Sequence, residues 1–119
     1  MKILIIDDDE TIIGLAKKLY DNHPEVVSVR CANTEEVMKV IGKHHPVDVI
    51  FLDHNFEDGG IGLDIVRGLK LQPKPPIIFS TSEEARDGDL HDQYASLGVE
   101  WVGKPREVMT EKINEFLER

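Results

Sequence analysis

Short apolar runs alternate with segments of helical periodicity along the whole chain. The runs are rich in β-branched residues and nearly continuously apolar, which is typical of strands buried on both faces of a parallel sheet. The segments between them repeat apolar positions at the spacing of amphipathic helices. This alternation predicts repeated βα units and an α/β fold. The predicted strands are Lys2–Ile6, Val26–Cys31, Val47–Leu52, Pro76–Ser80 and Val99–Val102.

The helical segments are predicted from their apolar faces and their end signals. The first ends before Pro24, because proline cannot continue a helix. Asn33 is predicted to cap the second, with Glu36 placed to complete a capping box, and Gly42 suits its C-terminal end. The segment Asp87–Leu97 is the weakest helix prediction because its apolar face is sparse. The other faces are Ile12, Leu15, Ala16 and Leu19; Val37, Val40 and Ile41; Leu63, Ile65, Val66 and Leu69; and Met109, Ile113, Phe116 and Leu117.

Composition and length favour one domain over residues 1–119. The chain has 119 residues, 40% hydrophobic and 31% charged, as in an ordinary soluble globular protein. Its apolar runs are too short to cross a bilayer, and Asp7–Asp9 interrupt the first of them, so we expect neither a signal peptide nor membrane insertion. Cys31 is the only cysteine and is expected to pack on its strand, so no internal disulfide can form. These features favour the cytoplasm.

The net charge disfavours one class of partner, nucleic acid. The formal charge is -9 at neutral pH, which would repel a nucleic-acid backbone. We therefore expect no direct nucleic-acid binding, and a cationic or protein partner fits better.

Polar residues follow the predicted strands. Asp7, Asp8 and Asp9 come after the first strand and Asp53 after the third. In an open parallel sheet, ligands bind outside the carboxyl ends of the strands, so these side chains are expected to meet at one edge. Thr81 after the fourth strand and Lys104 after the fifth would add a hydroxyl and an ammonium group there.

The converging carboxylates predict a divalent cation. Carboxylates that share a crevice repel one another unless a cation lies between them. An all-oxygen set with room for water suits Mg²⁺. Asp9 is the exception, since it is more simply interpreted as the cap of the first helix. His54 adjoins Asp53 and could influence access to it, but it has no Cys or His partner at zinc-ligand spacing.

The segments KILIIDDDE, VDVIFLD, PIIFSTS and WVGKP together resemble the signature segments of response regulator receiver domains. The resemblance covers the whole chain. It implies a flavodoxin-like (βα)5 doubly wound sheet of order 2-1-3-4-5, with Asp53 as the phosphoacceptor. It also implies Mg²⁺ held by Asp8, Asp53 and the Asn55 carbonyl, with Asp7 acting through water.

The resemblance also assigns roles around the acceptor. Lys104 would supply a positive charge opposite the metal, and Thr81 would move its hydroxyl to the new phosphoryl group. Trp101 stands where such domains often carry a switch aromatic, and a static core residue on the edge strand is the less favoured alternative. Asn55 and Glu83 occupy the positions that tune dephosphorylation. Both are polar and able to orient water, so we expect a short-lived phosphorylated state.

One departure from the family pattern lies in the segment DHNFEDGGIGLD after the acceptor. It has no proline where receiver domains commonly carry one, its Gly-Gly pair loosens the loop, and it looks about one residue longer than usual. We expect these changes to tune rates and partner choice while leaving the chemistry intact.

Three functions remain in competition on the sequence alone. The leading one is a signalling receiver, not an enzyme, that takes a phosphoryl group from a histidine kinase or histidine phosphotransfer protein and regulates a downstream target or output domain. A pseudo-receiver that binds protein without phosphate comes second, because the acid pocket, Thr81 and Lys104 are all present. A hydrolase with an aspartyl-phosphate intermediate comes last, because no second acid is evident to protonate a leaving group.

Overall fold

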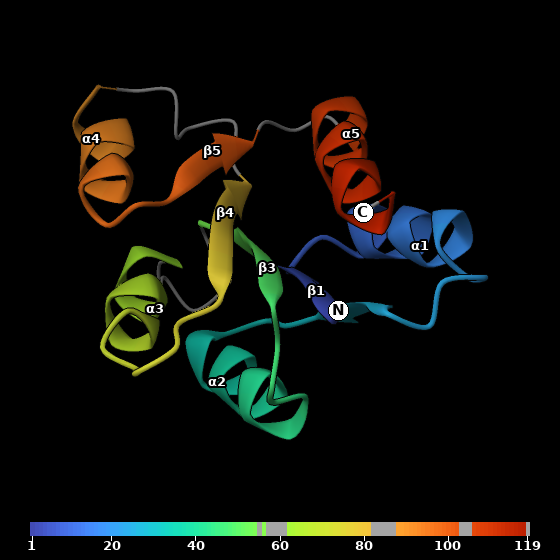
Figure 1. The fold of residues 1–119 in the computed structure, drawn as a ribbon, viewed down its shortest axis with the longest axis horizontal. Coiled ribbons are helices and arrows are strands. Elements are labelled where there is room, and N and C mark those ends of the chain that lie inside the picture. The colour runs from blue at the N-terminus through green and yellow to red at the C-terminus, as the bar shows by residue number, and fades with distance from the viewer. Residues whose placement is uncertain (55, 57–61, 82–87, 103–105, 119) are drawn as a thin grey trace.

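The strands of the protein form one parallel sheet in the order β2-β1-β3-β4-β5. The computed structural model describes residues 1–54, 56, 62–81, 88–102 and 106–118, without the side chains of residues 88–91, 101 and 106–109. The predicted α/β fold and strand order are confirmed (Figure 1). The elements are β1 Ile3–Asp7, α1 Glu10–Leu19, β2 Val26–Arg30, α2 Thr34–Lys43, β3 Val49–Asp53, α3 Gly62–Leu69, β4 Ile77–Thr81, α4 Gly88–Ser96, β5 Glu100–Val102 and α5 Arg106–Leu117.

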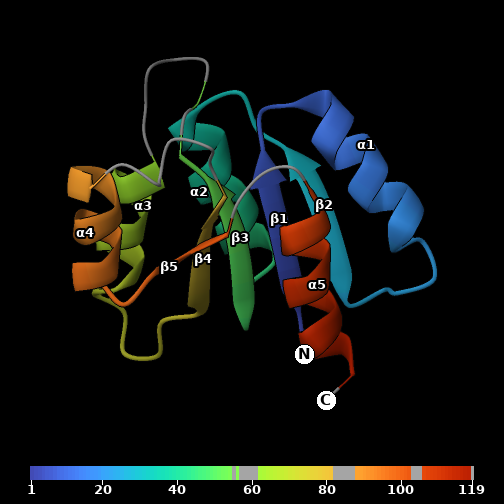
Figure 2. The same cartoon turned by 90° about the horizontal axis from the view of Figure 1, so that it is seen from above.

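Helices cover both faces of the sheet. Figure 2 shows α1 and α5 on one side and α2, α3 and α4 on the other. Alternate strand residues point to opposite faces, so Ile50 and Leu52 pack with α2 and α3, whereas Val49 and Phe51 pack with α1 and α5. Burial on both faces explains why the strands are nearly continuously apolar.

Side-chain caps fix where the first two helices begin. The Asp9 carboxylate accepts a hydrogen bond from the Thr11 backbone N–H at 2.8 Å, which confirms Asp9 as the cap of α1. The Asn33 side chain accepts from the Glu36 N–H at 2.9 Å at the start of α2. The Glu36 carboxylate reaches back to the Ala32 N–H at 2.7 Å, one residue before the cap itself. The predicted capping box is therefore present in a slightly longer form.

The strand boundaries differ from the predicted ones by one or two residues. Three strands extend into polar residues, because Asp7 pairs with Arg30 and Asp53 pairs with Thr81 in the parallel ladder. Asp7, Asp53 and Thr81 are therefore the last residues of their strands, whereas the prediction placed them directly after the strands. β4 begins at Ile77, since Pro76 has no backbone N–H to donate to a ladder.

The apolar face predicted for α1 was wrong at Leu19. Ile13, Ala16 and Tyr20 are buried, whereas Leu19 is 51% exposed. Tyr20, the C-cap residue directly after Leu19, packs into the core in its place, and Leu19 turns toward solvent. The weakly predicted fourth helix is present as α4, and its residue Tyr94 is buried.

Candidate functional site

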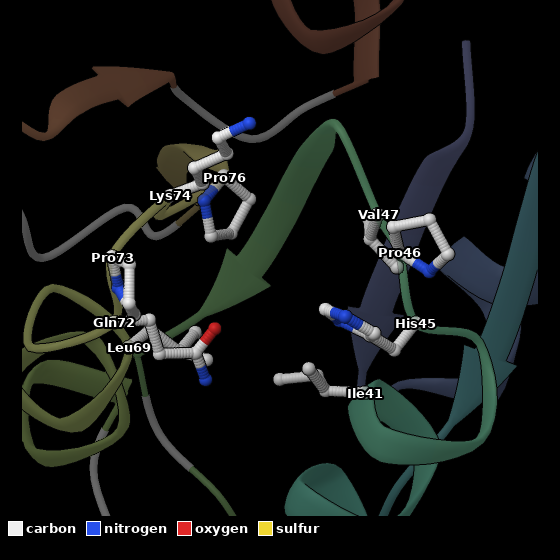
Figure 3. Close-up of a pocket in the computed structure, with 9 residues that line it drawn as sticks. All are labelled: Ile41, His45, Pro46, Val47, Leu69, Gln72, Pro73, Lys74 and Pro76. Carbon is white, nitrogen blue, oxygen red and sulfur yellow. The ribbon is translucent and has the colours of Figure 1, made fainter.

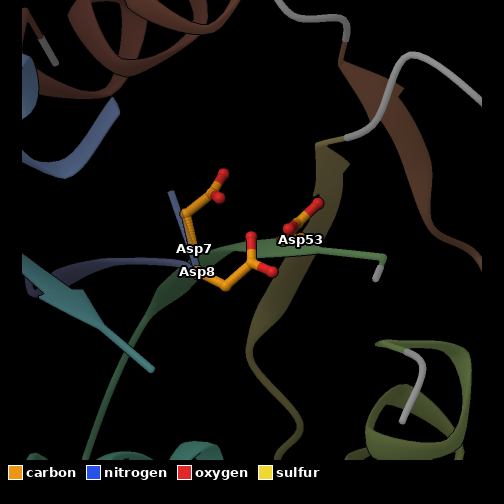
Figure 4. Close-up of side chains that lie close together, drawn as sticks. All are labelled: Asp7, Asp8 and Asp53. Carbon is orange, nitrogen blue, oxygen red and sulfur yellow. The ribbon is translucent and has the colours of Figure 1, made fainter. Parts of the chain in front are cut away.

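Three carboxylates meet at the carboxyl edge of the sheet. Asp7 ends β1, Asp8 follows it, and Asp53 ends the neighbouring strand β3. One carboxylate oxygen from each residue lies within 4.8 Å of those of the other two. Figure 4 shows the three side chains gathered at the ends of these strands. The structure thus brings together the acids that the sequence predicted would meet.

The backbone orients the two buried members of this acid cluster. Asp7 is 1% exposed and Asp53 is 4% exposed. Asp7 Oδ1 accepts a hydrogen bond from the Asp9 N–H at 2.9 Å, and Asp53 Oδ1 accepts one from the His54 N–H at 2.8 Å. Each bond fixes one oxygen of a carboxylate whose burial already restricts its rotation. Backbone N–H groups of the protein therefore position the Asp7 and Asp53 carboxylates.

The donor chemistry of the acid cluster fits a hard divalent cation. All three side chains offer oxygen, and Asp8 remains partly accessible to solvent. Mg²⁺ binds oxygen at about 2.0–2.1 Å and commonly uses one or two carboxylates together with water. Ligand oxygens on opposite sides of one ion would be about 4 Å apart, close to the spacing seen here. The residues present therefore fit the ion, through direct or water-bridged contacts.

Thr81 lies beside the acceptor position. It ends β4, is 2% exposed, and pairs with Asp53 in the ladder between β3 and β4. Residues opposite one another in a ladder point to the same side of the sheet. The Thr81 hydroxyl therefore belongs to the same edge and the same face as the Asp53 carboxylate.

Several predicted site residues fall beyond the described part of the chain. Asn55, Glu83 and Lys104 lie outside the described residues. Trp101 is placed by its backbone alone, in β5 opposite Ser80. The roles suggested for these residues remain predictions.

Sequence analysis missed a buried polar pair behind the acceptor. The His54 ring is 6% exposed, and its Nδ1 lies 2.6 Å from the Tyr94 hydroxyl of α4. The rings meet edge to face with centroids 5.6 Å apart. The His54 side chain is buried against α4, and its suggested influence on access to Asp53 remains a prediction. The only indication in the sequence was the position of His54 beside Asp53, and this position does not identify Tyr94 as the partner.

Tyr94 is strongly protected from ionisation. Burial raises the pKa of Tyr94 to about 12, while the neighbouring Ser80 hydroxyl acts in the opposite direction and the Asp53 charge adds to the increase. Ser80 precedes Thr81, and His54 follows Asp53. His54 thus contacts the Tyr94 hydroxyl directly, whereas the buried Ser80 hydroxyl has no hydrogen-bond partner among the described residues.

A glycine allows α3 to begin against the acceptor segment. The Gly62 N–H donates to the His54 carbonyl at 2.7 Å. A Cβ at this position would collide with the Asp53 backbone carbonyl and come within 3.2 Å of the Tyr94 hydroxyl. Only glycine fits without a shift of the backbone. The sequence analysis did not single out Gly62, because its reason lies in a contact between separate elements.

Other candidates behave as ordinary structural residues. Cys31 is buried in the core as predicted, and burial raises the pKa of its thiol to about 11. His23 is partly exposed and its Nδ1 lies 3.1 Å from Glu25. Within the described residues, no helix is both long enough and apolar enough to cross a membrane.

Comparison with known proteins points to one family. The family described as "Response regulator receiver domain" matches residues 3–113. A protein-glutamate methylesterase/protein-glutamine glutaminase from Bordetella pertussis is 29% identical over 120 residues, which cover 99% of this chain and 34% of that protein. A second such protein, from Bordetella avium, is 30% identical and covers 89% of this chain and 30% of its own length. The chain thus spans about a third of these curated relatives.

Solved structures agree on the fold. The chemotaxis protein CheY4 of Vibrio cholerae superposes with a TM-score of 0.76 at 22% identity, covering 96% of each chain. A structure described as the BeF3-activated DrrB receiver domain gives a TM-score of 0.75 at 21% identity, covering 99% of this chain and 97% of that one. At these identities the likeness concerns the fold.

Proposed function

Because the chain belongs to the response regulator receiver domain family, we propose that it is a phosphorylation switch that accepts a phosphoryl group on Asp53. The observation that carries this proposal is the acid cluster, in which the Asp53 carboxylate lies within 4.8 Å of those of Asp7 and Asp8. Thr81 lies beside Asp53 on the next strand. A protein-binding module without phosphate chemistry would not require this arrangement.

The reaction is a transfer between two acceptors. An Asp53 carboxylate oxygen forms the new bond to phosphorus, and the bond from phosphorus to the donor breaks. The donor atom, an imidazole nitrogen of a phosphohistidine or the acyl oxygen of acetyl phosphate, leaves with the electron pair. Asp53 Oδ1 accepts a hydrogen bond from the His54 N–H at 2.8 Å, which orients the carboxylate at the edge of the sheet.

Asp8, Asp53 and the Asn55 carbonyl would hold Mg²⁺ directly, with Asp7 acting through water. When bound, the ion supplies positive charge that offsets the charge of the phosphoryl oxygens. The residues that hold it are oriented beforehand by the backbone bonds to Asp7 and Asp53. This pre-organisation lowers the cost of collecting like charges at the moment of transfer.

The remaining residues read out the modified state. Lys104 pairs with the phosphoryl group from the opposite side, and the Thr81 hydroxyl donates a hydrogen bond to it. Trp101 follows the movement of Thr81 from the adjacent strand. Such switches couple their sites by about 1–3 kcal/mol, so phosphorylation shifts a population between two conformations.

The partners follow from the same chemistry. A histidine kinase or histidine phosphotransfer protein in the cytoplasm supplies the phosphoryl group, and a downstream protein or output domain reads the switched surface. The net charge of -9 disfavours direct contact with nucleic acid.

Acetyl phosphate tests the proposal without a partner protein. Intact mass should show one added phosphoryl group in the presence of Mg²⁺ and little or none when the metal is chelated. Asp53→Asn should remove the labelling. Asp9→Asn is the matched control, because Asp9 caps α1 and lies outside the acid cluster. Equal labelling of wild type and Asp53→Asn, with both folded by circular dichroism, would exclude Asp53 as the acceptor.

A further inference from the structure

A groove opens at the amino edge of the sheet, at the opposite end of the strands from the acid cluster. It has a volume of about 350 Å³, within the range of ligand-binding pockets. One wall is the end of α2 and the chain leading into β3, and the other is the end of α3 and the chain leading into β4. Figure 3 shows Ile41 and His45 facing Leu69 and Gln72 across the open space.

The groove is apolar, and apolar side chains beside it are exposed. Ile41, Val47 and Leu69 contribute to its lining, together with prolines from both walls. Leu71, in the turn that forms one wall, is 87% exposed, and Ile77, directly after the lining residue Pro76, is 48% exposed. Exposed apolar side chains at the rim of a concave site favour binding of another molecule there.

The charge around the groove has the opposite sign to the charge of the molecule. No Asp or Glu occurs between Glu36 and Asp48 or between Asp64 and Glu83, and these are the stretches that form the two walls. Lys74 lines the groove itself, and Lys43 and Lys70 lie in the adjoining segments. In a chain with net charge -9, this is a local concentration of positive charge on apolar surface.

The nearest acids do not cancel this positive charge. The Asp48 carboxylate accepts a hydrogen bond from the Lys2 backbone N–H at 2.7 Å, and the Lys2 ammonium group lies nearby on the His44 carbonyl. Glu35 and Asp64 line a separate hollow near the beginnings of α2 and α3. They limit the positive region to the ends of the two helices.

The acid cluster is too far away to dominate the groove. A strand of five residues spans about 17 Å, at a rise of about 3.3 Å per residue. At that distance two unit charges interact by only about 1 kcal/mol, at an effective dielectric constant of about 20. A ligand at the groove therefore experiences mainly the local lysines.

We propose that this groove binds a short acidic segment of a partner protein, anchored by leucine-like side chains. The apolar lining accommodates the anchors, and Lys43, Lys70 and Lys74 pair with the flanking carboxylates. A peptide fits better than nucleic acid, because the lining is concave and apolar and a long polyanion would extend onto the acidic remainder of the molecule. The proposal does not depend on phosphorylation of Asp53.

A designed peptide provides the probe. The ¹⁵N-labelled chain would be titrated with acetyl-Glu-Glu-Leu-Asp-Glu-Leu-Glu-Glu-amide and followed by backbone amide chemical shifts. We expect shifts concentrated at Val47, Leu69, Gln72 and Lys74. Two control peptides separate the contributions: replacement of Glu and Asp by Gln and Asn removes the charge, and replacement of Leu by Ala removes the anchors. Each should bind more weakly than the probe.

Charge reversal locates the site. Lys74→Glu should raise the dissociation constant roughly three- to tenfold, because a surface ion pair of up to about 1 kcal/mol is replaced by repulsion. Lys18→Glu on the exposed face of α1 changes the net charge equally and should leave the constant nearly unchanged. Equal weakening by both variants, or shifts that avoid the groove, would overturn the proposal. Groove shifts that appear with rising protein concentration alone would also overturn it, since a second copy would then be the occupant.

Discussion

The two edges of the sheet are built in opposite ways. At the carboxyl edge, the Asp7 and Asp53 carboxylates are buried and accept hydrogen bonds from backbone N–H groups, and Asp8 is partly exposed. At the amino edge, Lys43 and Lys74 are exposed, and the apolar side chains of Leu71 and Ile77 are exposed beside an open groove. One sheet of parallel strands thus carries a largely buried acidic site at one end and an exposed cationic surface at the other.

The two edges suit different tasks because their charged groups differ in burial: the carboxyl edge suits a reaction, and the amino edge suits recognition of a partner. Buried carboxylates repel one another and need fixed geometry and a cation, which suits a reaction that tolerates little displacement. Exposed lysines cost little to keep in water and contribute mainly to the rate and selectivity of association. We therefore expect substitutions at the carboxyl edge to have larger effects than equivalent ones at the amino edge.

Replacing a glycine by alanine near each edge should give the largest difference between the edges, measured as a change in the free energy of unfolding. Gly62→Ala places a Cβ against the Asp53 carbonyl and should lower the free energy of unfolding by about 1–3 kcal/mol. Gly42→Ala, at the end of α2, meets nothing within 4 Å and should raise it by up to about 1 kcal/mol through helix propensity. Urea unfolding of the two variants measures the difference. Equal changes would mean that the close approach at Gly62 is absent.

Removing one acid should affect the metal at one edge only. Asp8→Ala should weaken Mg²⁺ binding by about tenfold or more, because a direct oxygen ligand is lost. Lys74→Glu changes the charge at the far edge and should leave Mg²⁺ affinity almost unchanged, because screening acts over a shorter distance. Titration calorimetry compares the two. Similar affinities for wild type and Asp8→Ala would place the ion elsewhere.

Removing the Tyr94 hydroxyl tests the buried polar pair. Tyr94→Phe leaves His54 Nδ1 without this partner and should cost about 1–3 kcal/mol of unfolding free energy. Tyr20→Phe is the control, because the Tyr20 hydroxyl makes a longer, partly buried contact of 3.3 Å with Asn114. The smaller loss is expected for Tyr20→Phe. The reverse order would show that the His54–Tyr94 contact contributes little to stability.

The same tyrosine predicts a loss of stability at high pH. The pKa of Tyr94 is about 12 in the folded chain, against an ordinary value of 10.0, so folding favours the protonated hydroxyl. Its contribution is complete below about pH 10 and is lost as the pH rises toward 12, as the unfolded chain ionises first. Tyr94→Phe should flatten that part of the stability profile. An unchanged slope would assign the alkaline loss to other groups.

Access of water to the phosphoryl group should depend on two positions that follow β3 and β4 in the sequence. Replacing Glu83 with Lys and Asn55 with Met should lengthen the lifetime of the phosphorylated state severalfold, since neither new side chain orients water as its predecessor does. Decay of the phosphorylated mass after removal of acetyl phosphate measures the lifetime. Lys43→Glu at the far edge is the control and should leave it unchanged. A long-lived wild-type phosphoprotein would contradict the expectation.

The parts of this molecule that follow local patterns could be predicted from the sequence. Continuous apolar runs predicted the strands, and the position of acids after those runs placed Asp7, Asp8 and Asp53 together. The order of the strands came from the resemblance to receiver domains, because apolar runs do not specify which strands pair. Helix caps at Asp9 and Asn33 were equally accessible, because they depend on residues only two or three positions away.

Contacts between distant elements could not be predicted. The His54–Tyr94 pair joins β3 to α4 across 40 positions, and no local pattern specifies it. The reason for glycine at position 62 is likewise a backbone carbonyl of another element. The groove could not be predicted either, since the two segments that form its walls have the sequence of ordinary connections between a helix and a strand.

Chemical mapping of the acceptor tests the central claim most directly. After reaction with acetyl phosphate and Mg²⁺, borohydride reduces an aspartyl phosphate to homoserine, which marks the modified residue permanently. Peptide mass mapping should find homoserine at position 53 alone, and only when both acetyl phosphate and Mg²⁺ were present. Homoserine at position 7, 8 or 9, or none at position 53 in a sample whose intact mass shows the phosphoryl group, would contradict the account.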